Sequence, residues 1–182
     1  ADGGRQVTLI DADLRHPSLR QLFALDCQGA GLTNLLLSKN LNGTGSQPTD
    51  LANLSVVTTG PLPPNPADLL SSQRMRSVMA RLQTDTDVVI LDSPPALAVA
   101  DAAILATMVD GVVIVIDPRT TKRRTLRKTR EAIEAVGGKV IGVVINQLEA
   151  RGNLYYYFYR HYGYQYHDGD PMAGGDEARD NK

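Results

Sequence analysis

The sequence predicts an α/β domain built on a doubly wound, mostly parallel sheet. Short apolar runs rich in β-branched residues recur along the first 150 residues, and longer stretches with helical spacing lie between them. Several runs are almost continuously apolar, which is typical of strands covered on both faces. Strands that alternate with helices imply parallel pairing through crossover connections.

The predicted elements follow in chain order. The expected strands are Val7–Asp11, Leu54–Thr58, Val88–Asp92, Val112–Asp117 and Val140–Asn146. The expected helices are Pro17–Ala24, Pro66–Leu82, Ala100–Met108 and Thr121–Val136, the last ending at a Gly-Gly stop signal. Gly43–Asp50 is expected to be a polar loop, and the proline-rich stretch Pro61–Pro66 a rigid connector.

Size and charge narrow the classes of function. The chain has 182 residues, enough for one α/β domain with a sizeable core, and its net charge is -1. That charge favours neither a nucleic-acid partner nor a membrane surface. A single cysteine, Cys27, fits a reducing cytosol. No apolar run approaches the roughly 20 residues that span a bilayer.

Aromatic residues divide the chain into two regions. Residues 1–150 contain Phe23 as their only aromatic side chain, whereas residues 151–182 hold Phe158 and all the tyrosines. The composition then turns to Gly, Asp and Asn, so we expect residues 151–182 to be a flexible tail. Its tyrosines are Tyr155, Tyr156, Tyr157, Tyr159, Tyr162, Tyr164 and Tyr166.

Two acids follow the first predicted strand. If strand geometry continues from Asp11 to Asp13, both carboxylates point to one face, about 6.6 Å apart. Ligands of open α/β sheets bind beyond the carboxyl ends of the strands. The pair could then flank a hydrated magnesium ion, or one acid could accept a proton. Equally, the acids could cap the helix near Pro17 or lie in a solvated loop.

A second strand also ends in an acid. Asp92 follows four apolar residues, which is the Walker B pattern for a carboxylate near magnesium and a nucleotide phosphate. Many buried strands end in an Asp that only caps a turn, so the pattern is weak by itself. Asp101, which precedes a predicted helix, is interpreted as an N-cap.

The phosphate loop that should accompany these acids is absent from the sequence. No Gly-x-x-x-x-Gly-Lys-Ser/Thr occurs; Gly137-Gly138-Lys139 is followed by Val140 and leads from a helix into a strand. The loop would belong before the first strand, where only Ala1–Gln6 precede. We therefore expect residues 1–150 to be a P-loop NTPase-like domain, N-terminally truncated, without its first strand and phosphate loop.

Several motifs together resemble the bacterial tyrosine kinases. Val7–Pro17 is similar to their Walker A′ motif, Val89–Pro95 to their Walker B, and Pro63–Leu70 to a stretch typical of the family. Gly142–Asn146 resembles their last core strand, and the tyrosine cluster completes the match. The resemblance covers most of residues 5 to 166. Septum-positioning and chromosome-partitioning ATPases are related but fit less well.

The resemblance implies roles for individual residues. Asp11 and Asp13 would be catalytic, one helping to activate the acceptor hydroxyl, and both would serve a magnesium site with Asp92. Asn146 would lie near the adenine of ATP. ATP and Mg²⁺ are therefore the expected cofactors, and the tyrosines in residues 155 to 166 the expected phosphoacceptors.

The implied function is an ATP-dependent protein-tyrosine autokinase that regulates the synthesis and export of exopolysaccharide or capsule. Its implied partners are like subunits in a ring, a transmembrane chain-length regulator (fused or separate) and a tyrosine phosphatase, at the inner face of the cell membrane. The phosphate loop and the family's Glu-x-x-Arg-x-x-Arg motif are both absent, so the chain as given is expected to be inactive. The alternatives are a partitioning-type ATPase switch and a fragment that only accepts phosphate.

Two further expectations concern the surface. By analogy with the family, the missing strand lies in the middle of the sheet, so inner strand edges should be exposed. A basic run on the last helix is interpreted as a solvated face; contacts to phosphorylated tails, a neighbouring subunit or anionic lipid are the alternatives. The run comprises Lys122, Arg123, Arg124, Arg127, Lys128 and Arg130.

Overall fold

The computed structural model describes residues 3–25, 31–38 and 43–147. The chain divides into two units, Ala1–Asn146 and Gln147–Lys182, and nearly all described residues belong to the first. The tyrosine cluster and Cys27 lie outside the described residues. Within the described ranges, every helix is too short or too polar to cross a bilayer.

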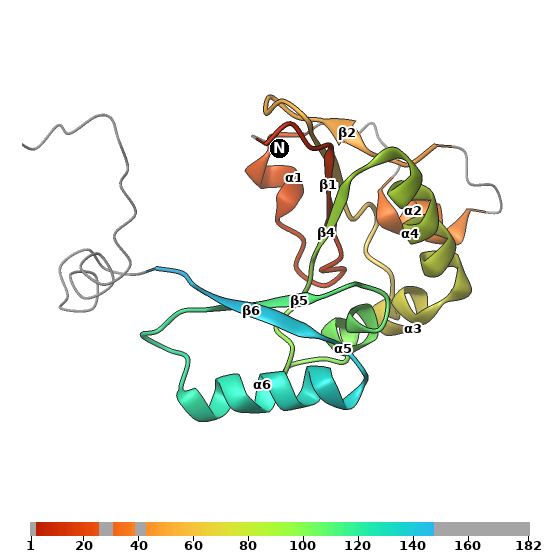
Figure 1. Ribbon diagram of the computed structural model, residues 1–182. Coiled ribbons are helices and arrows are strands. Elements are labelled where there is room, and N and C mark those ends of the chain that lie inside the picture. The colour runs from red at the N-terminus through yellow and green to blue at the C-terminus, as the bar shows by residue number, and fades with distance from the viewer. Residues whose placement is uncertain (1–2, 26–30, 39–42, 148–182) are drawn as a thin grey trace, which may run out of the picture. The chain divides into compact units, whose positions relative to one another are not determined.

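A four-stranded sheet forms the centre of the first unit (Figure 1). Its central strand β1 (Val7–Asp11) pairs in parallel with β3 (Leu54–Val57) on one side and with β4 (Val88–Asp92) on the other. The short β2 (Gln47–Pro48) adds an antiparallel edge next to β3. β1 is covered on both faces and paired along both edges. Its nearly continuous apolar sequence is typical of such a central strand.

A second sheet contains the last two strands. β5 (Val112–Ile116) pairs in parallel with β6 (Val140–Ile145), and α6 (Arg123–Ala135) connects them. Among the described strands, β4 and β5 each have a neighbour on one side only. The described strands therefore form two separate sheets, and the expectation that a strand is missing between inner edges stays a prediction. The side chains of Val113, Val115 and Val144 are exposed.

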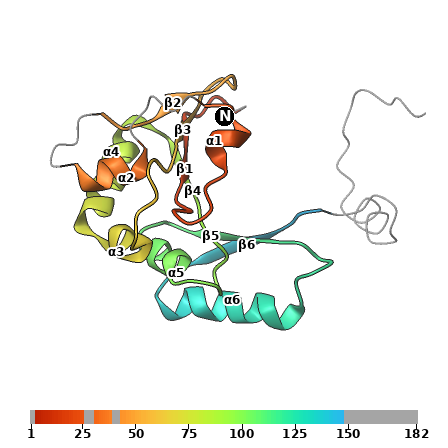
Figure 2. The ribbon, with the colours of Figure 1, turned by 180° about the vertical axis from the view of Figure 1, so that it is seen from behind.

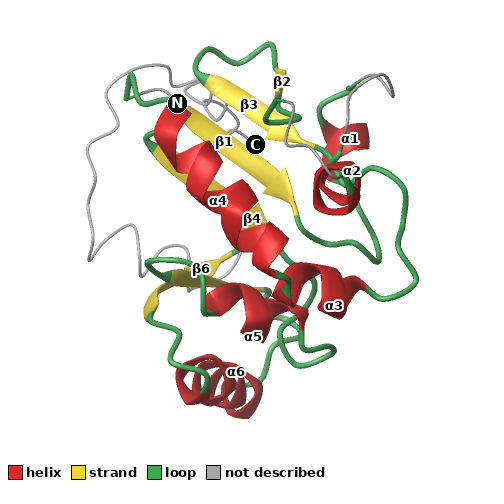
Figure 3. Ribbon diagram, turned by 90° about the vertical axis from the view of Figure 1, so that its right-hand side faces the viewer, coloured by secondary structure: helices red, strands yellow, loops and turns green. Residues whose placement is uncertain are grey.

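The main core lies between the four-stranded sheet and the helices on one of its faces. α4 (Gln73–Asp85) crosses this face (Figure 3), accompanied by α2 (Leu32–Leu37), α3 (Pro66–Ser71) and α5 (Asp101–Ala106). The four-residue α1 (Leu19–Leu22) lies on the other side of the sheet (Figure 2). The buried cluster includes Ile10, Leu14, Leu32, Val57, Leu70, Met75, Val78, Leu82 and Leu105.

The predicted helix Pro66–Leu82 is wrong as a single helix. It breaks at Ser72, whose backbone is extended with ψ 153°, and α4 begins at the next residue. The Ser72 hydroxyl accepts a hydrogen bond from the amide of Met75, so a serine inside the predicted helix acts as the N-cap of a second one. The break lets Leu70 and Met75 both enter the core.

Two elements were missed by the sequence analysis. β2 lies inside the stretch Gly43–Asp50, which was predicted to be a loop, and α2 was not predicted. α2 starts where Gly31 packs against Gly60: a side chain on Gly31 would overlap the Gly60 backbone, and Gly60 has a φ of +79°. The glycine at position 31 therefore serves close backbone packing.

We expect Leu70→Ala to destabilise the first unit by about 2–5 kcal/mol, because it leaves a cavity among fully buried side chains. The exposed Leu62→Ala is the matched control and should shift the free energy of unfolding by less than about 0.5 kcal/mol. Urea unfolding followed by circular dichroism measures both. Equal effects of the two variants would contradict the assigned core.

Candidate functional site

Parallel pairing brings two carboxylates to one edge of the four-stranded sheet. β1 ends at Asp11 and β4 ends at Asp92, and these two residues are direct partners in the register. The pairing continues one residue further, where the amide of Ala12 donates to the carbonyl of Asp92 at 2.9 Å. Neighbouring strands lie about 4.8 Å apart, so the two side chains leave the sheet side by side.

Asp11 is fully buried and only half satisfied. Its Oδ2 accepts hydrogen bonds from the amides of Ser18 at 3.1 Å and Leu19 at 3.0 Å. Asp11 thus stabilises the start of α1, a helix-capping role that the sequence analysis gave as the alternative to a magnesium site. Its Oδ1, however, is buried without a hydrogen-bond partner among the described residues. An orphaned carboxylate oxygen at the carboxyl edge of a sheet is a position that a cation or a water can occupy.

Asp13 lies beyond the strand. β1 ends at Asp11, so the condition that strand geometry continues to Asp13 is not met. Instead, Asp13 Oδ1 accepts from the amides of Arg15 at 3.0 Å and His16 at 2.9 Å, which closes a turn. Its side chain is half-buried and lies close enough for its charge to act on both other acids.

The pKa values of Asp11 and Asp92 are both raised above the usual range of an aspartate. Burial is the main cause that raises the pKa of Asp92, and the charges of Asp11 and Asp13 raise it further, against a hydrogen bond from the Ser93 amide. Burial also raises the pKa of Asp11, and the charge of Asp13 adds a smaller contribution. The amides of Leu19 and Ser18 and the nearby hydroxyl of Thr59 oppose the shift. Negative charge is therefore concentrated at this edge of the sheet. A bound cation would lower the electrostatic free energy of the ionised carboxylates.

The residues fit a hydrated magnesium ion better than a direct cage of carboxylates. Among residues 3–25, 31–38 and 43–147, no three acidic, histidine or cysteine side chains gather closely enough to hold an ion alone. Mg²⁺ usually retains several waters and takes only one or two carboxylates. The orphaned Oδ1 of Asp11 beside Asp92 matches that donor set. The metal role of Asp11, Asp13 and Asp92 stays a prediction.

An ion pair that the sequence analysis missed fixes the segment after β1. Arg15 donates from Nε to Asp101 Oδ2 at 2.9 Å and from Nη2 to Asp101 Oδ1 at 3.0 Å. Asp101 is fully buried and is the first residue of α5, so its prediction as an N-cap is wrong; the cap residue is Ala100. The two partners are 86 positions apart, and no local pattern could have revealed the pair.

Asn146 lies at the end of the other sheet. It directly follows β6, is exposed, and its amide donates to the carbonyl of Ile116 at 2.8 Å. This bond extends the pairing of β5 and β6 by one residue. The asparagine therefore stands at a carboxyl edge, the type of position from which side chains reach ligands in α/β sheets. Its contact with a nucleotide stays a prediction.

Comparison with a protein-family model identifies the broad class of protein to which the chain belongs. The ParA family model, described as NUBPL iron-transfer P-loop NTPase, matches residues 1–160. The match agrees with the observed parallel sheet and with acids at the carboxyl ends of its strands. The fold is that of a ParA-type P-loop NTPase.

Individual relatives narrow the class. Tyrosine-protein kinase YwqD of Bacillus subtilis (strain 168) is 40% identical over 159 residues, which cover 87% of this chain and 67% of YwqD. The putative tyrosine-protein kinase EpsB of Ralstonia solanacearum is 35% identical over 166 residues, 91% of this chain but 22% of EpsB. The kinase domain of Escherichia coli tyrosine kinase ETK has a TM-score of 0.77 at 30% identity, covering 83% of this chain and 59% of that domain. The chain belongs to the bacterial tyrosine-protein kinase family.

We expect Arg15→Ala to cost about 1–3 kcal/mol of stability, because it leaves the buried carboxylate of Asp101 without its bidentate partner. Changing Asp101 to Asn in the same chain should recover part of the loss, since the remaining group is neutral. The exposed pair of Arg127 and Glu131 is the control, where Arg127→Ala should cost less than about 1 kcal/mol. Chemical denaturation of the wild type, the single variants Arg15→Ala and Asp101→Asn, and the double variant gives the coupling energy. A coupling near zero would contradict a structural role for the pair.

The raised pKa of Asp92 predicts a pH dependence with a definite sign. The folded state takes up this proton at a higher pH than the unfolded chain, whose Asp has a pKa of 3.8. The contribution of Asp92 to the free energy of unfolding therefore rises as the pH falls through the pKa of the folded state. The gain is complete below the pKa of the unfolded state. Asp92→Asn should raise the melting temperature at pH 7 without divalent cations and flatten the profile between pH 7 and 4. The exposed Asp50→Asn is the matched control variant. A lower melting temperature for Asp92→Asn would contradict the cost of holding a partly buried carboxylate beside two others.

Proposed function

We propose that this chain is the catalytic part of an ATP-dependent protein-tyrosine autokinase that phosphorylates its tyrosine cluster between neighbouring copies. The observation that carries the proposal is the pairing of Asp11 with Asp92 at the carboxyl edge of a parallel sheet, in a chain that also carries seven tyrosines between residues 155 and 166. Kinship with the bacterial tyrosine-protein kinases supports the same reaction.

The proposed reaction requires a proton acceptor. The phenol oxygen of a tyrosine attacks the γ-phosphorus of ATP, an oxygen–phosphorus bond forms, and the bond to the ADP oxygen breaks. A phenol has a pKa near 10, so a carboxylate that takes its proton assists the attack at neutral pH. Asp11 and Asp13 are the carboxylates proposed to accept the proton, and the raised pKa of Asp11 makes its proton uptake less unfavourable.

Charge balance is the second requirement. Asp92 and Asp11 are proposed to hold Mg²⁺ through water, and the ion bound to ATP would neutralise charge on the transferred phosphoryl group. Asn146 is proposed to contact the adenine. The ParA-type fold supports the use of a nucleotide. The backbone cradle for the phosphates is supplied by a Gly-x-x-x-x-Gly-Lys-Ser/Thr loop, which this sequence does not contain.

The proposed setting is polysaccharide export. Membership in a kinase family that includes a putative kinase named EpsB supports a role in exopolysaccharide or capsule synthesis. The matched region is most of YwqD but about a fifth of EpsB, so the same domain occurs in short and in long proteins. We accordingly propose a ring of like subunits, a transmembrane chain-length regulator that is fused or separate, a tyrosine phosphatase as antagonist, and a location at the inner face of the membrane.

A second candidate function follows from the missing phosphate loop. A chain without that loop could accept phosphate from an active copy without transferring phosphate itself. The tyrosines and the fold would serve both functions equally. The two candidates differ in what the chain does when it is alone with ATP.

We expect Mg²⁺-dependent and ATP-dependent labelling confined to residues 155 to 166 when the chain is extended at its N-terminus with a strand and a phosphate loop. Mass spectrometry of proteolytic peptides locates the phosphate. Asp11→Asn and Asp13→Asn should each reduce labelling at least about 100-fold, because general acid–base catalysis contributes about 10²–10⁴. The exposed Asp50→Asn is the matched control and should be labelled normally.

The same assay separates the two candidates. Labelling of the unextended chain when it is alone with ATP would favour the autokinase. Labelling of the unextended chain only after an active extended copy is added would favour the function of phosphate acceptor. Labelling of the extended chain that persists in both Asp variants would remove these acids from the mechanism. Labelling outside the tyrosine cluster would contradict the proposed acceptor.

A further inference from the structure

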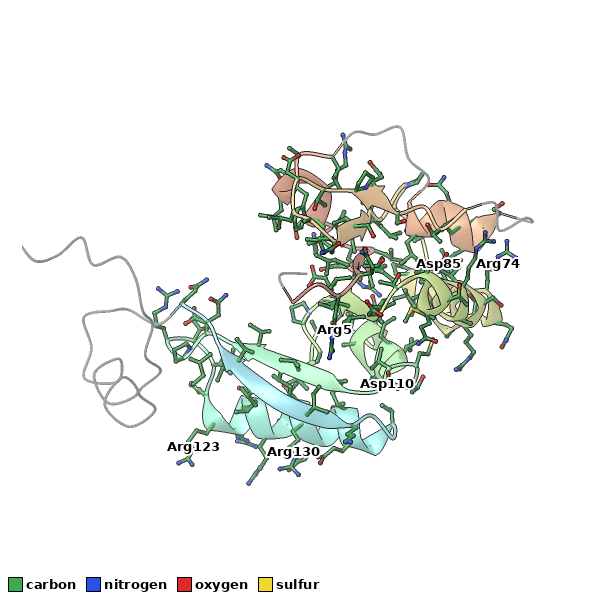
Figure 4. All side chains as sticks on the ribbon, turned by 45° about the horizontal axis from the view of Figure 1, so that its top comes forward. Arg5, Arg74, Asp85, Asp110, Arg123 and Arg130 are labelled. Atoms are coloured by element: carbon green, nitrogen blue, oxygen red, sulfur yellow. The ribbon has the colours of Figure 1, made fainter. Side chains whose placement is uncertain are left out.

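Helix α6 carries a continuous cationic surface, which we call the arginine face. From Lys122 to Arg130 the chain contains no acidic residue, and the acids Glu131 and Glu134 follow in the second half of the helix. Figure 4 shows Arg123 and Arg130 extending outward from the helix. The arginine face consists of Lys122, Arg123, Arg124, Arg127, Lys128 and Arg130.

The charges of the arginine face are only partly compensated. Arg127 pairs with Glu131 at 3.4 Å and Arg130 with Glu134 at 2.8 Å. Arg123, Arg124 and Lys128 make no ion pair with any other residue that the structure describes. All three are exposed, so their cationic groups can reorient toward a ligand without breaking an ion pair with a described residue.

The cations stand at the unfavourable end of the helix. The N-terminus of a helix has a partial positive charge, which favours acids and disfavours Lys and Arg. α6 nevertheless has Lys122 as its N-cap residue, no side-chain cap hydrogen bond and no acid in its first turn. A bound anion would offset this local repulsion.

An apolar groove lies beside the arginine face. It has a volume of about 670 Å³, within the range of ligand sites, and runs between α6 and the β5–β6 sheet. Val143, which lines it, remains 45% exposed, so the groove is not filled by the described side chains. Its lining combines Ile114, Leu126, Val140 and Val143 with Arg123, Arg124, Arg127 and Arg130.

A ligand for this surface needs an apolar part and a strong negative charge close together. A phosphotyrosine has both, since its ring is aromatic and its phosphate carries about -1.5 to -2 charges at neutral pH. Arginine can grip such a phosphate through two parallel hydrogen bonds and can stack on an aromatic ring. This chain carries seven candidate aromatic acceptors of phosphate.

We propose that the groove beside α6 binds the phosphorylated tyrosine segment, residues 155 to 166, of a second copy of this chain. The ring enters between Leu126 and Val143, and Arg123 and Arg124 hold the phosphate. Phosphorylation of the tyrosine segment would then create an attractive contact between two copies, in addition to the repulsion among the phosphates. The inference rests on the proposed tyrosine phosphorylation, but its test uses a synthetic phosphopeptide and requires no kinase activity.

The experiment measures binding of a fluorescent peptide with the sequence of residues 153–166, phosphorylated at Tyr157 and Tyr159, to the full chain at 150 mM salt. Fluorescence anisotropy should show saturable binding, with the unphosphorylated peptide at least about tenfold weaker. Arg123→Gln combined with Arg124→Gln should weaken binding by about tenfold or more, because charge-assisted hydrogen bonds are lost. Arg5→Gln combined with Arg76→Gln removes the same charge elsewhere and is the matched control.

Two further arms separate this ligand from other anions. A peptide with phosphoserine at the two positions keeps the charge but lacks the rings, and it should bind at least about tenfold more weakly; equal affinity would overturn the role of the groove. If both double variants lose the same affinity for the phosphopeptide, the binding depends only on the net charge of the protein, and the proposal is overturned. Vesicles of phosphatidylserine test the lipid alternative: binding to vesicles that needs Arg123 and Arg124, without peptide binding, would refute the inference.

Discussion

The candidate site depends on the parallel register between β1 and β4. The register sets Asp11 opposite Asp92, and the following bond from the Ala12 amide to the Asp92 carbonyl fixes it beyond the last strand residue. A slip of one residue would turn one carboxylate to the other face of the sheet, and a slip of two would separate them by about 7 Å. Burial of Ile10 and Val57 on the core side makes such slips costly. Apolar packing on one face thus determines the electrostatics at the edge.

Asp11 serves the fold and the site through different oxygens. Its Oδ2 satisfies two amides at the start of α1, so removal of the carboxylate would loosen the segment that follows β1. Its Oδ1 accepts no hydrogen bond from the described residues. The cap and the cation-binding interpretations of the sequence are therefore compatible, because a carboxylate has two acceptors. The Arg15–Asp101 pair holds the far end of the same segment, and together they define the backbone on which Asp13 sits.

The sequence predicted the elements whose signals are local. β1 and β4 were predicted with their observed limits, because each is a short apolar run closed by an acid. The helix break at Ser72 was missed because the apolar spacing continues across it, while the break places both Leu70 and Met75 in the common core. The acids at the strand ends were predictable from pattern, whereas the ion pair of Arg15 was not, since its partner comes close only through folding of the whole unit. The conformation after β1 likewise depends on hydrogen bonds to backbone amides that no spacing encodes.

Burial is unevenly distributed along the described chain. Four of the five residues of β1 are buried, whereas β6 has no buried residue and α6 buries only Ile133. Because the free energy of local opening follows the apolar contacts that opening breaks, the segment from β5 to β6 can open while the rest stays folded. Its amide hydrogens should exchange with solvent well before those of β1. The arginine face therefore belongs to a sparsely buried part of the domain, where a bound ligand would add contacts that the described residues do not supply.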